Sequence, residues 1–244
     1  MLNFLYAWGA PKTFYHYSKV LSKGFGIVSI LALLFGWVWG LCYSPSDYQQ
    51  GDSVRIMYIH VPAAFLSLSI YAFMASCALV TLVWRIKIAG LLLKSAALVG
   101  LVMTLLALVT GSLWGKPTWG AWWVWDARLT GELILLFIYA GLLALDNTLG
   151  ENPASDKIVA IICWIGLLDL PIIHYSVQWW NTLHQGSSLL VMAKPKIHAS
   201  MLYPLLCSLL GMLCFAGWAI LSLTQVALLK REYRQQWVKT LEFK

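Results

Sequence analysis

Charged residues are scarce in this sequence of 244 residues. Asp, Glu, Lys and Arg make up only 11% of the chain, whereas 60% of the residues are hydrophobic. A soluble protein carries roughly a quarter of its residues as charges, because charge must cover much of its surface. The shortage of charge therefore excludes an ordinary soluble domain and indicates a membrane protein.

Several enzyme motifs are also absent. The sequence has no Walker motif and no glycine-rich phosphate loop, so we expect ATP hydrolysis to belong to a partner subunit, not to this chain. It has no HExxH motif and no cysteine cluster of the kind that binds zinc. The five cysteines form no CxxC pair, and most lie in apolar stretches, where cysteine is usually a small hydrophobic residue. These absences predict a component that is not an enzyme.

Six apolar stretches are each long enough to cross a bilayer, which takes about 20 residues. They cover residues 24–43, 56–84, 92–114, 131–148, 157–176 and 200–229. The predicted fold is all-α, a polytopic membrane protein with six transmembrane helices and short amphipathic helices on its outer surface. We divide the chain into a cytoplasmic interfacial segment (1–23), a six-span domain (24–229) and a cytoplasmic basic tail (230–244).

The basic residues are distributed unevenly over the two sides. Six spans place both termini on one side, and with that side inside, 12 of the 17 Lys and Arg residues are cytoplasmic and 5 lie outside. Cytoplasmic loops of membrane proteins carry the excess of Lys and Arg. We therefore predict that both termini are cytoplasmic, in a bacterial inner membrane, and that the loops 44–55, 114–130 and 177–199 are periplasmic.

A tryptophan-rich segment, WGKPTWGAWWVWDARLT at residues 114–130, lies between the third and fourth spans. Five tryptophans are more than an ordinary interfacial belt requires, and they favour an aromatic surface for a large, flat, apolar ligand. If the segment is one helix, Trp119, Trp123 and Asp126 share a stripe, and Trp122, Trp125 and Leu129 share the next. The candidate ligand-binding residues of the segment are Trp114, Trp119, Trp122, Trp123, Trp125, Asp126 and Arg128.

Four of the five histidines belong to the predicted outer side. His60 lies in YIHVP at the start of the second span, and His184 lies in QWWNTLHQG in the last outer loop. A short helix there would place Trp180 and His184 on one face and end at Gly186. These two histidines on either side of the tryptophan-rich segment indicate a pair of metal ligands. His174 and His198 are weaker candidates, because each lies near the mouth of a span.

Two carboxylates lie within predicted spans. Asp169 lies inside the fifth span, where an ionisable residue indicates either a function or a partner on a neighbouring helix. Glu132 is expected in the first turn of the fourth span, where it would complement the helix dipole.

Haem fits the predicted outer site best. Its macrocycle is flat and apolar, its iron takes axial imidazoles, and its propionates need cations. Arg128, Arg55 and Lys116 are nearby cations in the sequence, with Lys194 and Lys196 as further candidates. A quinone would use the aromatic residues but not the paired histidines.

The segments WGAWWVWDARLT and YIHVP, with the size and the span count, resemble the WWD-domain haem-handling proteins, and among them the CcmC family of the cytochrome c maturation system. The resemblance implies that haem b is bound at the periplasmic face, with His60 and His184 as axial ligands. It implies delivery of haem to the periplasmic chaperone CcmE, aided by the small membrane protein CcmD. The ATPase CcmA and the membrane subunit CcmB would complete an ABC transporter complex. No nucleic acid partner is expected.

Three kinds of function stay open at this point. The first is a platform that binds haem and delivers it for c-type cytochrome biogenesis. The second is a haem exporter or channel, which needs a polar path across the membrane. The third is a b-type cytochrome, which is disfavoured because such proteins bury their ligands deep within spans, whereas His60 and His184 lie at a helix start and in a loop.

Overall fold

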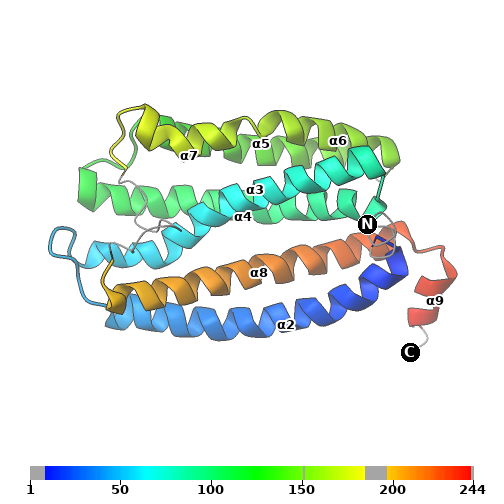
Figure 1. The fold of residues 1–244 in the computed structure, drawn as a ribbon, viewed down its shortest axis with the longest axis horizontal. Coiled ribbons are helices and arrows are strands. Elements are labelled where there is room, and N and C mark those ends of the chain that lie inside the picture. Colours follow the sequence, from blue (N-terminus) through cyan, green and yellow to red (C-terminus); the bar gives the residue numbers. More distant parts are fainter. Residues whose placement is uncertain (1–8, 151, 185–196, 243–244) are drawn as a thin grey trace.

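The computed structural model of the chain describes residues 9–150, 152–184 and 197–242. It is an elongated bundle in which the long helices run along one common direction (Figure 1). Six helical segments are long and apolar enough to cross a membrane: Pro11–Tyr43, Asp52–Trp84, Lys87–Trp119, Ala127–Leu149, Pro153–Trp179 and Ala199–Arg231. The all-α prediction with six spans is therefore confirmed.

The first two spans combine different helix types. Helix α2 (Pro11–Trp37) continues as the π-helix η1 (Val38–Tyr43), and the 3-10 helix η2 (Asp52–Ile56) leads into α3 (Met57–Trp84). Helix α2 passes without interruption through residue 23, where we placed the end of an interfacial segment. Where the membrane surface crosses this helix stays a prediction.

The remaining spans are α4 (Lys87–Trp119), α5 (Ala127–Leu149), the pair α6 (Pro153–Gly166) and α7 (Asp169–Trp179), and α8 (Ala199–Arg231). A short helix, α9 (Gln236–Glu242), lies within the predicted tail. The fifth span is interrupted between α6 and α7. Pro171 has no N–H for the carbonyl of Leu167, and that carbonyl instead accepts a 3.3 Å hydrogen bond from the Leu170 N–H.

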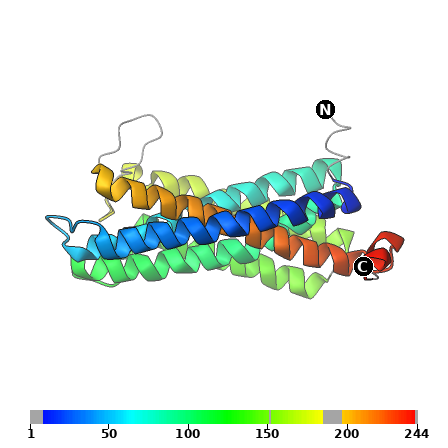
Figure 2. The same cartoon turned by 90° about the horizontal axis from the view of Figure 1, so that it is seen from below.

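The helices form three layers. Helices α2 and α8 pair along one side, α3 and α4 lie in the middle, and α5 with α6 and α7 forms the other side (Figures 1 and 2). Glycine allows the close approach of α2 and α8, since a Cβ added to Gly36 would lie 2.7 Å from the Ser208 nitrogen. Small residues serve this purpose in membrane helices, where backbone proximity supplies the packing energy.

The centre of the bundle is filled by large side chains. Tyr71, Met74, Leu135 and Tyr139 are fully buried between α3, α4 and α5. Each tyrosine hydroxyl donates a hydrogen bond to a backbone carbonyl: Tyr139 to Ser67 at 2.7 Å, and Tyr71 to Cys163 at 3.0 Å beside the α6–α7 interruption. These two buried hydroxyls are thus satisfied within the bundle.

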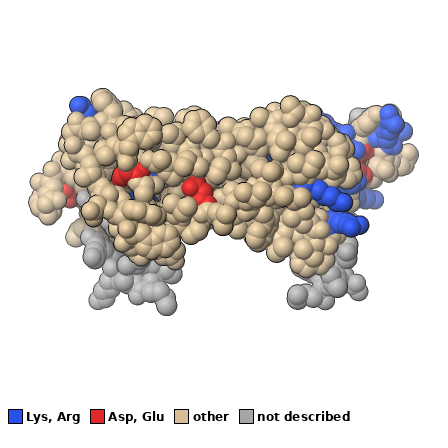
Figure 3. All heavy atoms as spheres, turned by 90° about the horizontal axis from the view of Figure 1, so that it is seen from above, with Lys and Arg blue, Asp and Glu red and all other residues tan. Residues whose placement is uncertain are grey.

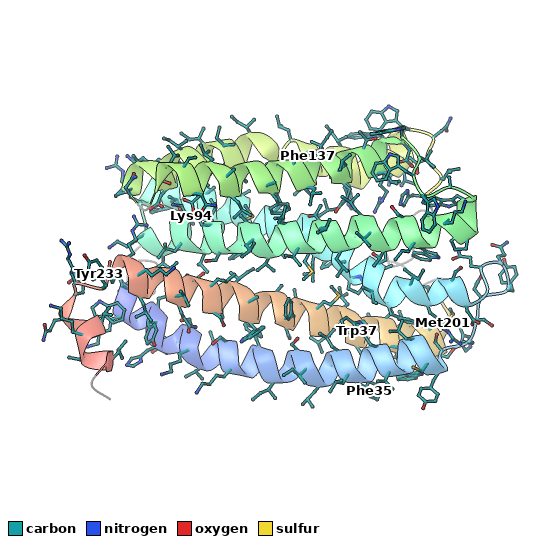
Figure 4. The ribbon with its side chains drawn as sticks, turned by 180° about the vertical axis from the view of Figure 1, so that it is seen from behind. Phe35, Trp37, Lys94, Phe137, Met201 and Tyr233 are labelled. Carbon is teal, nitrogen blue, oxygen red and sulfur yellow. The ribbon has the colours of Figure 1, made fainter. Side chains whose placement is uncertain are left out.

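A charge cluster ties the helices together at the end of the bundle where α2 begins and α8 ends. Lys94 lies between α4 and the α5–α6 pair (Figure 4), with its Nζ 2.5 Å from Asp146 Oδ1 and 2.8 Å from Asp156 Oδ1. Arg231 of α8 pairs with Asp156 at 2.8 Å. Lys and Arg also gather at this end of the surface (Figure 3). The predicted orientation places this end in the cytoplasm, and it stays a prediction.

Candidate functional site

The predicted site residues lie at the opposite end of the bundle. The start of α3, the end of α4, the start of α5 and the segment after α7 all meet at this end (Figure 1). The tryptophan-rich segment and both candidate histidines, His60 and His184, therefore belong to one end of the molecule. The sequence could only place them on the same side of a membrane.

The tryptophan-rich segment is not one helix, so the predicted helical stripes are wrong. Helix α4 continues through Trp119 and ends at Gly120, which has a left-handed backbone with φ 78°. Helix α5 begins at Ala127 after Asp126, whose Oδ1 accepts a 2.8 Å hydrogen bond from the Leu129 N–H. Glycine after a helix and Asp before one are the ordinary stop and start signals. Two tryptophans thus lie on α4, and the others lie in the loop.

The ring of His60 contacts α4 about two to three turns before the end of that helix. Its Nδ1 lies 3.0 Å from the Ala107 carbonyl oxygen and 3.1 Å from Thr110 Oγ1. A carbonyl oxygen can only accept, so Nδ1 carries the proton and Nε2 keeps its lone pair. The ring fits closely against α4 because position 111 is glycine, where an added Cβ would lie 2.9 Å from His60 Cε1. The edge of the ring packs on Trp114 at 5.7 Å between centroids.

His184 is oriented by two residues of the tryptophan-rich segment. Its ring packs against Trp119 of α4 at 4.8 Å between centroids. Its Nδ1 lies 3.5 Å from Asp126 Oδ2, the carboxylate oxygen that does not cap α5. That distance is long for a hydrogen bond, and the contact is mainly electrostatic. The predicted helix that joins Trp180 and His184 is wrong, because α7 ends at Trp179 and Trp180 is extended.

Burial, first of all, lowers the pKa of His184, and the neighbouring Arg128 guanidinium lowers it further, whereas Asp126 opposes the shift. The imidazole is therefore neutral at neutral pH, which is the form that binds metal. His184 and Arg128 also lie near enough to His60 to act on its charge. The two histidines and the arginine thus form one electrostatic group.

Two nitrogen donors of the tryptophan-rich segment have no hydrogen-bond acceptor in the parts of the chain that the structure describes. The indole Nε1 of Trp123 is buried and unpartnered. The half-buried guanidinium of Arg128 is in Coulombic range of Asp126 and Glu132, but no hydrogen bond to it occurs among these residues. Both donors are therefore available to a ligand that carries hydrogen-bond acceptors.

Other aromatic residues at this end of the bundle are exposed. Trp122, Trp125 and Trp180 expose 56%, 76% and 50% of their surface. Trp125 packs edge-on against Trp123 at 5.5 Å, and Lys116 lies over the Trp122 ring at 5.9 Å. These three tryptophans offer apolar surface to a ligand that approaches from outside the bundle.

Three weaker candidates have structural partners elsewhere. Arg55 donates hydrogen bonds to the carbonyls of Leu41 and Ser44, where the wide turns of η1 leave acceptors unsatisfied. His198 caps the start of α8 through Ser200. His174 is exposed on α7 and packs on Tyr175. Gly186, Lys194 and Lys196 lie outside the described residues.

The sequence reasoning missed the residues that orient the site. Ala107, Thr110 and Gly111 lie on α4 less than two turns before Trp114, and Gln50 accepts a 2.8 Å hydrogen bond from the Trp114 indole. The Thr–Gly pair ahead of the tryptophans was a usable signal, since a small residue in a span indicates close packing. Glu132 is not in the first turn of α5 as predicted, because α5 begins at Ala127 and Asp126 fills the capping position.

Comparison with known proteins finds a family model and several relatives that match most or nearly all of the chain. The family model described as CcmC, heme exporter protein C, matches residues 4–239. The heme exporter protein C of Haemophilus influenzae is 46% identical over 241 residues, which cover 99% of this chain and 98% of that protein. That of Escherichia coli strain K12 is 48% identical over 218 residues, covering 89% and 88%. A putative cytochrome c biosynthesis ccmC-like mitochondrial protein of Marchantia polymorpha is 44% identical over 192 residues, covering 78% and 79%.

Proposed function

The chain belongs to the heme exporter protein C family, and from this premise we propose that it binds haem b between His60 and His184 and delivers it for cytochrome c maturation. One observation carries the proposal. Two imidazoles from distant parts of the chain lie in one electrostatic group, each with its Nδ1 toward an acceptor and its ring against a tryptophan of α4. Iron-ligating histidines are oriented in this way by the partner of the second ring nitrogen.

The donor set fits haem better than a bare metal ion. No group of three or more His, Cys, Asp or Glu side chains is gathered for a metal within the ranges 9–150, 152–184 and 197–242. Two imidazoles alone do not complete the shell of an ordinary protein-bound metal, but a porphyrin supplies four nitrogens of its own. The two imidazoles would then be the axial ligands.

The unpartnered donors fit the carboxylates of haem. Arg128 acts on the charge of both histidines, Trp123 lies in the same tryptophan-rich segment, and neither has an acceptor of its own in the described chain. A guanidinium binds a carboxylate through two parallel hydrogen bonds. We assign the propionates to Arg128 and Trp123, and the porphyrin faces to Trp114 and Trp119, with the exposed tryptophans at the outer edge.

The exposed tryptophans at this end of the bundle support a role in delivery. Trp122 and Trp125 are exposed at the end of the bundle, so one edge of a bound porphyrin is reachable from outside the membrane. On this proposal the acceptor is the periplasmic chaperone CcmE, with CcmD beside it and with CcmA and CcmB as the ATPase and its membrane subunit. Neutral imidazoles and an apolar surround keep water from the iron until transfer.

The alternatives are export of haem through the chain and electron transfer. The buried centre of the described bundle is filled by side chains such as Tyr71, Met74 and Tyr139, and this argues against a polar path for haem. His60 is the fourth residue of α3 and His184 lies in a loop, and this argues against a deeply buried cytochrome. Haem uptake from the cytoplasmic side of sealed vesicles would favour export.

The test is the absorption spectrum of the purified protein with four single substitutions. His60→Ala and His184→Ala should each lose most of the bound haem. His174→Ala and His198→Ala are matched controls, since both histidines are exposed and have partners elsewhere, and they should retain it. If the first pair retains haem as well as the controls do, the ligand assignment is wrong.

A further inference from the structure

A groove of about 480 Å³ runs between α5 and the interrupted span α6–α7, and none of the haem-site residues lines it. Its walls are apolar apart from one carboxylate. The main lining residues are Ile134, Ile138 and Gly141 of α5, and Ile165, Asp169 and Ile172 across from them. Acidic atoms appear among uncharged side chains on this face of the bundle (Figure 3). The groove therefore lies on a surface that the bilayer would otherwise cover.

The carboxylate of Asp169 is buried and lacks a hydrogen-bond partner on one oxygen. Its exposure is 8%, and its Oδ2 is buried without a hydrogen-bond partner in the described chain. It is the first of the 11 residues of α7, so it lies roughly 16 Å from the outer end of the span at 1.5 Å per residue. That is near the middle of a hydrocarbon core about 30 Å thick. An acidic side chain there needs a partner.

The interruption of the span changes the backbone hydrogen bonds beside the groove. In a regular helix the Leu170 N–H would donate to the Gly166 carbonyl, but here it donates to Leu167. Gly166 lines the groove together with Asp169. Asp169 is therefore the only lining residue whose side chain can form a hydrogen bond, and the Gly166 carbonyl beside it does not receive the Leu170 N–H.

We propose that this groove is the docking site for a transmembrane helix of a partner protein that presents a hydrogen-bond donor at mid-span. Lipid headgroups do not reach this depth, and acyl chains carry no donor. A helix can approach closely, because a Cβ at Gly141 would meet no atom within 4 Å and the nearby Ala140 and Ala144 are exposed. Small residues at such a surface, with a polar group as an anchor, are typical of membrane helix interfaces.

The test uses the full-length chain in phosphatidylcholine vesicles and two synthetic transmembrane peptides of Leu and Ala. One peptide has a central Lys, and the other has Leu at that position. Energy transfer between the labelled chain and each peptide measures association. We expect the Lys peptide to associate about 5- to 30-fold more strongly, the range expected for one interhelical polar contact.

Three variants locate the contact. Asp169→Leu should abolish the preference for Lys, and Asp169→Asn, which keeps an acceptor and the shape, should reduce it. Gly141→Phe should weaken both peptides by filling the groove, without disturbing the fold, since that position faces open space. Val102→Phe on the exposed face of α4 is the control and should change nothing.

Equal association of both peptides with the unaltered chain would overturn the proposal, and so would an unchanged Lys preference in Asp169→Leu. A small amphiphile is the other possible occupant. If decylamine displaces the Lys peptide while Gly141→Phe leaves peptide association intact, the groove binds a small amine and helix docking is wrong. Haem content is measured separately in each variant, so that failure here is distinguishable from failure of the haem assignment.

Discussion

Replacing Asp126 with Asn is expected to separate the two tasks of this carboxylate. One oxygen caps α5 through the Leu129 N–H at 2.8 Å, and the other lies 3.5 Å from His184 Nδ1. Asn caps helices about as well as Asp, so the cap survives with little loss of stability. The amide NH₂ can face the His184 Nδ1–H only as a second donor, so the orienting contact is lost.

The size of the effect follows from the geometry. Loss of the carboxylate behind a metal-ligating histidine costs about 10- to 100-fold in affinity. The 3.5 Å separation is at the long limit for a hydrogen bond, so we expect the lower end, about 10-fold or roughly 1.4 kcal/mol. Asp126→Ala loses the cap as well, which costs about 1 kcal/mol of stability in addition.

The assay is a haem titration followed by absorption, beside a thermal unfolding curve for the wild type, Asp126→Asn and Asp126→Ala. Weaker haem binding with nearly unchanged unfolding in the Asn variant would support the orienting role. If the Asn variant binds haem as tightly as the wild type, while the Ala variant is weakened in both assays, Asp126 acts only as a cap and the reasoning is refuted.

Three further predictions concern titration, packing and stability. Because Arg128 lowers the pKa of His184 from its ordinary value, Arg128→Gln should raise the titration midpoint of the His184 ring, as followed by NMR in haem-free protein. Neutral His184 should meanwhile persist below about pH 6.5, the value for a free histidine. Gly111→Ala should displace His60, 2.9 Å from the new Cβ, and lower haem affinity in the same absorption titration. Asp156→Ala should destabilise the fold by about 3 kcal/mol in thermal or denaturant unfolding, since it leaves the mostly buried Arg231 without this carboxylate, whereas Lys94 keeps Asp146.

The packing and stability predictions each have a control variant. Gly24→Ala adds a methyl group where no atom lies within 4 Å, and it should leave haem affinity unchanged. Asp52→Ala removes a carboxylate that is 76% exposed and paired with Arg55, and it should cost less than about 1 kcal/mol. A fall in the His184 midpoint in Arg128→Gln would contradict the assigned cause of its shift. Equal losses in Asp156→Ala and Asp52→Ala would show that the inner charge cluster is not a buried network.

Span positions could be predicted from the sequence because they depend on local composition. The predicted second span, 56–84, agrees with the helical segment Asp52–Trp84, and the predicted sixth, 200–229, agrees with Ala199–Arg231. Continuous apolar stretches must satisfy their own backbone in a bilayer, and only a helix does this within one segment. The interruption of the fifth span was also foreseeable, since Pro171 cannot donate to the preceding turn.

The shape of the tryptophan-rich segment could have been read locally but was not. Gly120 ends one helix and Asp126 begins the next, six residues later, so Trp122, Trp123 and Trp125 lie in the loop between them. The predicted stripes required one continuous helix, and Gly120 and Asp126 interrupt it. The helix predicted to join Trp180 and His184 was wrong for a similar reason, because α7 ends at Trp179 and Trp180 is extended.

Amino-acid sequence alone determined the membrane class, the six spans and the types of residue at the outer end, since these depend on the composition of short stretches. Only the tertiary structure showed what surrounds the two histidines: the Ala107 carbonyl lies against His60, Asp126 lies beside His184, and Arg128 has no acceptor among the described residues. It also decided that Asp169 borders a groove. The physical reason is that these contacts join residues tens of positions apart, and their geometry is set by the packing of whole helices.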